Sequence, residues 1–134
     1  MRTVLSLLLA VSVAACFDGG LGPPQGSLVG TWGGDDAGFI VTDTSAHAHM
    51  GCTKGDVHAR ILADAFGRFD VLGEYNVNVY PVDLGILHPA RFIGQVTGAR
   101  MTLTIVLTDT TLSFGPVSLR YGRAPEMAMC PICR

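Results

Sequence analysis

The sequence predicts an all-β domain, an antiparallel meander of about eight short strands that closes, or nearly closes, into a small barrel. Two observations predict it. Apolar and polar residues alternate along several segments, which is the period of a strand with one buried face. Glycine and proline, 17 and 7 of the 134 residues, interrupt the chain so often that no long helical pattern survives after the first 16 residues.

The clearest strand is expected at 101–107, where Met101, Leu103, Ile105 and Leu107 alternate with residues that are mostly threonine. Turns are expected at 64–67 and 97–100, a break at Gly115-Pro116, and a loop between Pro81 and Pro89. The other strand candidates start at Gly30 or cover 38–44, 46–52, 57–63, 69–71, 74–80, 91–96, 117–121 and 126–130.

Two architectures fit so many short strands, a closed barrel and a two-sheet sandwich. The barrel is favoured because closure removes the exposed strand edges through which sheets aggregate.

The first 16 residues, MRTVLSLLLAVSVAAC, combine a basic Arg2, an apolar run from Val4 to Val13, and small residues before Cys16. This segment resembles a bacterial lipoprotein signal, because Val13-Ala14-Ala15-Cys16 matches the lipobox. The resemblance implies cleavage before Cys16, a lipid on its sulfur, and attachment to a membrane by that lipid.

Three parts of the chain follow from this pattern. Residues 1–15 form the cleaved signal, residues 16–28 the lipidated cysteine with a Gly/Pro-rich flexible tether, and residues 29–134 one all-β domain. Phe17, rather than aspartate, follows the cysteine. By the sorting rule known for enterobacterial lipoproteins, this implies the outer membrane of the bacterial cell envelope.

The remaining cysteines are Cys52, Cys130 and Cys133. Because compartments outside the cytoplasm are oxidising, two of them are expected to form a structural disulfide. Cys52–Cys130 is the favoured pair, and Cys52–Cys133 is the alternative.

His47 and His49 are expected to share the outer face of one strand. If Thr53-Lys54-Gly55 closes a hairpin, His58 would lie opposite His49 and join them. Such a cluster of imidazoles would bind zinc or copper. The simpler interpretation is a polar outer face without a ligand.

Gly30-Thr31-Trp32 resembles the Gly-x-Trp opening of lipocalin-type barrels. This resemblance implies an alternative function, the carriage of a small apolar ligand inside the barrel. The residues expected to line that cavity are Trp32, Phe69, Phe92, Met101 and Leu103.

The mature chain also resembles a loose group of small all-β bacterial lipoproteins, a likeness that implies no activity. The shared features are an early tryptophan, a Cys-x-x-Gly hairpin, two glycine-led strands and a late cysteine. Here they are Trp32, Cys52-Thr53-Lys54-Gly55, Gly67-Arg68-Phe69, Gly98-Ala99-Arg100-Met101-Thr102-Leu103 and Cys130.

Composition narrows the function further. A net charge of −2 excludes a strongly basic nucleic-acid binder, and no second apolar run is long enough for a polytopic membrane protein. Common catalytic and phosphate-binding motifs are missing from the sequence. We therefore expect no enzyme and no cofactor, but a lipid-anchored module with a structural or interaction role and an envelope protein as its partner.

Overall fold

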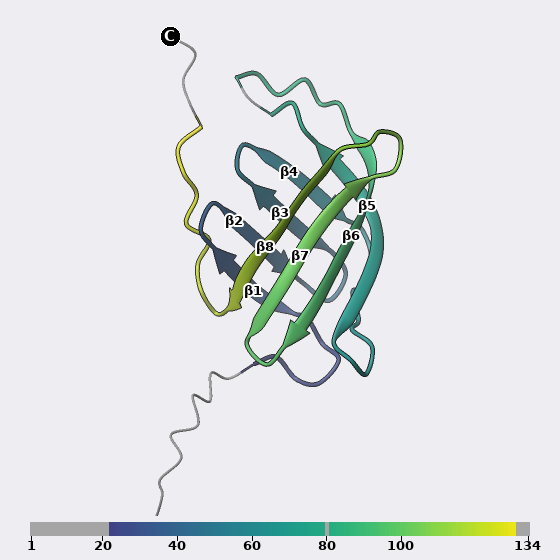
Figure 1. The fold of residues 1–134 in the computed structure, drawn as a ribbon, viewed down its shortest axis with the longest axis vertical. Helices are drawn as coiled ribbons and strands as arrows, with labels where there is room; N and C mark the ends of the chain where they lie inside the picture. Colours follow the sequence, from purple (N-terminus) through teal and green to yellow (C-terminus); the bar gives the residue numbers. More distant parts are fainter. Residues whose placement is uncertain (1–21, 80, 131–134) are drawn as a thin grey trace, which may run out of the picture.

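The computed structural model describes residues 22–79 and 81–130, and in them eight antiparallel strands close into a barrel (Figure 1). The predicted fold class is confirmed. The strands are β1 (Gly30–Gly34), β2 (Ala37–Val41), β3 (Ala46–Met50), β4 (Thr53–Val57), β5 (Arg68–Asn76), β6 (His88–Thr97), β7 (Arg100–Leu107) and β8 (Ser113–Tyr121).

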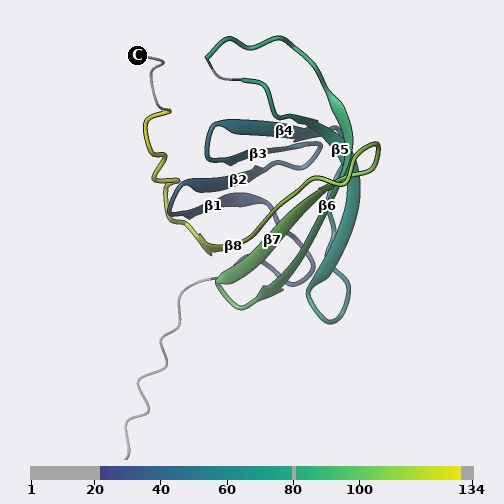
Figure 2. The same ribbon diagram turned by 45° about the horizontal axis from the view of Figure 1, so that its top comes forward.

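Each strand pairs with the next along the chain, and β8 returns to pair with β1. That closing contact is short, since it joins only Trp32 to Tyr121 and Gly33 to Arg120. The strands β1 to β4 are short, whereas β5 to β8 are longer and curve around them (Figure 2).

The interior is filled by alternate residues of the strands, as the period of two predicts. Along β7, Met101, Leu103, Ile105 and Leu107 are buried, while Thr102 between them is exposed. The predicted strand at 101–107 is therefore confirmed, with Arg100 added at its start.

Aromatic rings occupy the middle of the barrel. Phe39 stacks on Phe69 and on Phe92, with 6.2 Å between ring centroids in each pair. Gly94 is the cross-strand partner of Phe69, and a Cβ there would lie 2.4 Å from the phenylalanine ring. Glycine in the wall thus makes the space that the ring fills.

One end of the barrel is closed by Leu28 and Trp32, which are both fully buried. The indole Nε1 of Trp32 donates to the carbonyl oxygen of Leu28 at 2.9 Å, and its ring meets Tyr121 edge-on at 5.0 Å. The polar group of the buried indole is therefore satisfied without water.

The candidate strand at 57–63 is wrong. Val57 ends β4, and the chain then crosses an end of the barrel, where Leu62 forms one isolated bridge with Ser27. Ile61 is buried under this crossing. Apolar residues alternate in this segment because it covers the end of the barrel, and not because it pairs with a neighbouring strand.

An expected break between two strands is absent. The segments expected at 69–71 and 74–80 correspond to the single strand β5, which includes Gly73 in its ladder and ends at Asn76, so residues 77–79 lie outside it. The missing side chain of Gly73 is needed, since a Cβ would lie 2.4 Å from the carbonyl oxygen of Asp56. The loop expected between Pro81 and Pro89 is present, and Pro89 at its border lies near the start of β6, a position where a strand tolerates proline.

The C-terminal boundaries also differ from expectation. β8 starts at Ser113 and runs through Gly115-Pro116, with an irregular register opposite β7 between Leu103 and Ile105. Residues 126–130 form no strand, and only Glu126 makes an isolated bridge, to Asp35.

Candidate functional site

Residues 122–130, here called the C-terminal strap, lie across the outer wall of β1 and β2. Its backbone is hydrogen-bonded to the strands: Gly122 donates to Thr31 at 2.8 Å, and Glu126 donates to Gly34 at 3.0 Å. The N–H of Asp36 donates in return to the carbonyl oxygen of Glu126 at 2.7 Å. The strap therefore adds backbone hydrogen bonds next to the short strands β1 and β2.

Two glycines allow the strap to lie directly against the barrel wall. Gly33 and Gly38 are cross-strand partners. A Cβ at Gly33 would lie 2.3 Å from the carbonyl oxygen of Arg123, and one at Gly38 would lie 2.4 Å from the Pro125 ring. Any side chain at either position would lift the strap from the wall.

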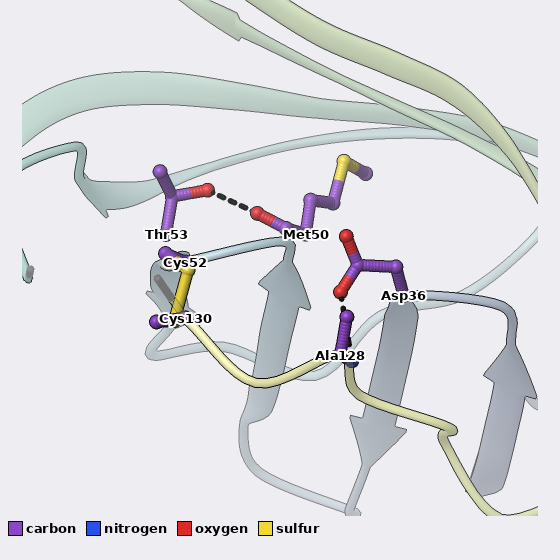
Figure 3. The surroundings of a disulfide bond; sticks show 6 residues. All are labelled: Asp36, Met50, Cys52, Thr53, Ala128 and Cys130. Carbon is purple, nitrogen blue, oxygen red and sulfur yellow. Dashed lines mark hydrogen bonds between the residues drawn. A yellow bond between two sulfur atoms is a disulfide. The ribbon is translucent and has the colours of Figure 1, made fainter. Parts of the chain in front are cut away.

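Polar side-chain contacts also hold the strap. The Arg123 guanidinium lies 2.6 Å from Asp35 and 3.1 Å from Glu126, and the hydrogen bond to Asp35 is the main reason that the pKa of Arg123 is raised. The N–H of Ala128 donates to the carboxylate of Asp36 at 3.1 Å (Figure 3).

The strap ends in a disulfide between Cys52 and Cys130, with 5.6 Å between the two Cα atoms (Figure 3). The favoured pairing is thus confirmed, whereas Cys133 lies outside the described residues. The bond joins the turn after β3 to a cysteine 78 residues away. In the chain-entropy model, closing a loop of this length stabilises the fold by about 4–5 kcal/mol.

His47 and His49 lie next to the strap, on the outer face of β3 as predicted. Their ring centroids are 4.7 Å apart. Both rings line a cavity of about 120 Å³, together with Ile40 of β2 and Met127 of the strap. Met127 of the strap therefore lines the same cavity as the two imidazoles.

Asp56 of β4 is the cross-strand partner of His47, and its carboxylate lies 2.6 Å from the imidazole Nδ1. An ionised carboxylate only accepts hydrogen bonds, so the Nδ1 of His47 carries the proton. In the neutral ring, the lone pair is then on Nε2.

The expected position of His58 opposite His49 is wrong. The turn between β3 and β4 is Gly51-Cys52, and this places Lys54 across from His49. His58 follows the end of β4, where its Nε2 lies 3.6 Å from Glu74. The hairpin turn expected at Thr53-Lys54-Gly55 lies further along the chain than the observed turn, and this difference accounts for the wrong register.

Within the described part of the chain, no group of three or more His, Cys, Asp or Glu residues is placed to hold a metal ion. The fourth histidine, His88, lies at the start of β6 with its Nδ1 2.8 Å from Asp109.

Burial lowers the pKa of His49, and the nearby His47 and Lys54 lower it further, while Asp56 opposes them. His49 also lines a second cavity, of about 230 Å³. Its lining includes Val79 and both cysteines of the disulfide.

Lys54 is turned toward the β5–β6 loop, where its Nζ lies 2.8 Å from Asp83. The same carboxylate accepts from the buried Asn76 at 2.7 Å and from the N–H of Gly85 at 2.8 Å. These bonds, that to Lys54 first, lower the pKa of Asp83 to about 2. Asp83 therefore fastens the loop to the barrel.

The five residues expected to line a ligand cavity lie inside the barrel, where they are packed and at most 4% exposed: Trp32, Phe69, Phe92, Met101 and Leu103. A hollow of about 600 Å³ lies instead beside residues 22–28 and 63–67, and none of the five lines it.

The sequence does not single out two residues of the outer face. Asp56 is one of them, although its spacing from His47 is compatible with a hairpin pair. Met127 is the other, since it falls in the strand expected at 126–130 and no local pattern shows that the strap carries it next to His47 and His49.

Comparisons with models of known families, with curated protein sequences and with solved structures find no match to this chain. No function is therefore transferred to it by similarity, and the geometry of its own residues has to support one.

Substituting Gly38→Ala is expected to lower the free energy of unfolding by about 1–3 kcal/mol, the usual cost of overpacking, because the new methyl group collides with Pro125. Pro125→Gly removes that ring. In its background, Gly38→Ala should cost much less. Urea denaturation of the two single variants and the double variant measures this coupling. Equal costs in both backgrounds would show that the strap does not lie on Gly38.

The stability supplied by Asp83 should depend on pH. Its pKa is lowered from 3.8 to about 2 on folding, so its contribution is full above pH 3.8 and is lost as the pH falls through 2. Wild type and Asp83→Asn should therefore differ most in stability above this range and converge within it. Denaturation series at several pH values measure the difference, with Asp43→Asn in the exposed β2–β3 turn as the control. A constant difference would contradict the assignment.

Proposed function

We propose that this protein is a lipid-anchored module of the bacterial cell envelope, with a structural or interaction role. The observation that best supports this proposal is the Cys52–Cys130 disulfide, because structural disulfides form and persist outside the reducing cytoplasm. The lipobox-like segment ending at Cys16 supports the anchor, and Phe17 supports the outer membrane.

The packed interior favours a structural or interaction role over ligand carriage. A carrier needs an interior cavity of some hundreds of Å³. Here the stacked rings of Phe39, Phe69 and Phe92 fill the middle of the barrel. The expectation of no catalytic residue and no cofactor rests on the missing sequence motifs alone.

Exposed apolar side chains on the β5–β6 loop support an interaction role. Val82, Leu84, Ile86 and Leu87 are between 45% and 65% exposed. The loop lies at the end of the barrel opposite the first described residues (Figure 1). A barrel anchored through its N-terminal side would present this apolar surface away from the anchor, as a contact for an envelope protein.

In residues 22–79 and 81–130, no helix has the length and apolar character needed to cross a membrane.

Replacing Cys16 by alanine tests the anchor. In cells fed an alkyne fatty acid, the wild-type protein should be labelled and recovered with the membranes. Cys16→Ala should lose the label and leave the membrane fraction, because two or more acyl chains are what hold such a protein stably. Cys133→Ala is the matched cysteine control and should keep the label. Labelling of Cys16→Ala at the wild-type level would refute the proposal.

A further inference from the structure

His47 and His49 differ from the other two histidines of the chain in their surroundings. His58 and His88 each lie next to a carboxylate, at 3.6 Å from Glu74 and 2.8 Å from Asp109. Only the pair on β3 places one imidazole against another, with 4.7 Å between the ring centroids. Alternate residues of a strand project on the same side, so both rings can turn toward one ion.

The hydrogen bond from His47 to Asp56 orients the His47 ring and leaves one ring nitrogen for a ligand. With the Nδ1 proton donated to the carboxylate at 2.6 Å, the Nε2 lone pair is left for a ligand. A carboxylate behind an imidazole in this way is the usual support of a metal-binding histidine, because it fixes the ring and makes it more basic.

Lys54 lies across from His49 and would repel a cation if it pointed toward the ring. Its ammonium group is instead 2.8 Å from Asp83 on the β5–β6 loop. The charge of the lysine is thus compensated by a carboxylate.

Met127 supplies a third, softer donor. It lines the same 120 Å³ cavity as the two histidines and is 40% exposed. The backbone of the strap is fixed on both sides of it, by the bond from Asp36 to Glu126 and by the disulfide at Cys130. The methionine side chain itself has three rotatable bonds and adapts easily to a bound ion.

We propose that His47, His49 and Met127 form a binding site for a single copper ion. Imidazole and thioether together favour copper, since thioethers select soft Cu(I), whereas zinc sites use thiolates, imidazoles and carboxylates. A cavity of 120 Å³ is suited to an ion and far below the size of an organic-ligand pocket. The site does not depend on the lipid anchor.

Competition with a chromogenic Cu(I) chelator tests the site on the purified full chain, kept under ascorbate with the disulfide intact. Wild type should withhold one equivalent of copper from the chelator. His47→Ala/His49→Ala should lose that binding. Asp56→Asn should weaken it by about 10-fold to 100-fold, as the loss of a supporting carboxylate does.

Two matched variants separate this site from general metal adsorption. His58→Ala/His88→Ala removes the same number of imidazoles and should bind like wild type. Met127→Leu conserves the size of the side chain, so it should bind Cu(I) at least about 10-fold more weakly and leave Zn²⁺ binding unchanged. Because this variant lies on an accessible side chain, its result stands even if the double histidine variant fails to fold.

Copper binding that persists in folded His47→Ala/His49→Ala, or that is lost equally in His58→Ala/His88→Ala, would overturn the proposal. So would wild-type Cu(I) affinity in Met127→Leu. Since the readout uses purified protein, these outcomes are independent of the test on Cys16.

Discussion

The contact between the C-terminal strap and the glycine pair Gly33 and Gly38 is the constraint on which the outer wall depends. Closure of the barrel rests on a short β1–β8 contact of two residue pairs. The strap continues from β8 directly across β1 and β2, and its backbone bonds to Thr31 and Gly34 extend that closure. Side chains at the two glycines would prevent this close approach.

The disulfide fixes the far end of the strap to the turn after β3, and this has a consequence for chemistry. Met127 lies between Glu126 and Ala128, whose backbone groups are hydrogen-bonded to Gly34 and Asp36. The disulfide adds a covalent bond to these contacts, and Met127 lines one cavity with His47 and His49. One covalent bond thus serves both the stability of a small barrel and the composition of its outer face.

Much of the barrel could be predicted from the sequence because alternating burial leaves a direct trace. β7 alternates almost perfectly, and Met101, Leu103, Ile105 and Leu107 all face the interior, whereas Val106 lies on the outer face with the threonines. The pairing of Cys52 with Cys130 was accessible from the number of cysteines and the expected compartment. The strand predicted at 57–63 is wrong because a chain that covers a barrel end also buries apolar residues, such as Ile61, without pairing as a strand.

The outer face was harder to predict, since its contacts join residues that are distant in the sequence. A turn placed two residues away changes the partner of His49 from His58 to Lys54, and no local signal distinguishes the two registers. Met127 comes to lie near His47 and His49 only through the path of the strap, which is fixed by hydrogen bonds at Glu126 and Ala128 and by the disulfide at Cys130. The sequence around Gly38 shows only a glycine within a strand, and the requirement for glycine there comes from the contact with Pro125.

Disulfide mapping tests the fastening of the strap most directly. Protein purified without reductant, blocked at free thiols and digested, should yield a peptide containing Cys52 joined to the peptide containing Cys130, with the link assigned to Cys130 by fragment ions. This is the result that the structure predicts. A free Cys52, or a link to Cys133 in its place, would contradict the account of the strap and of the outer face built on it.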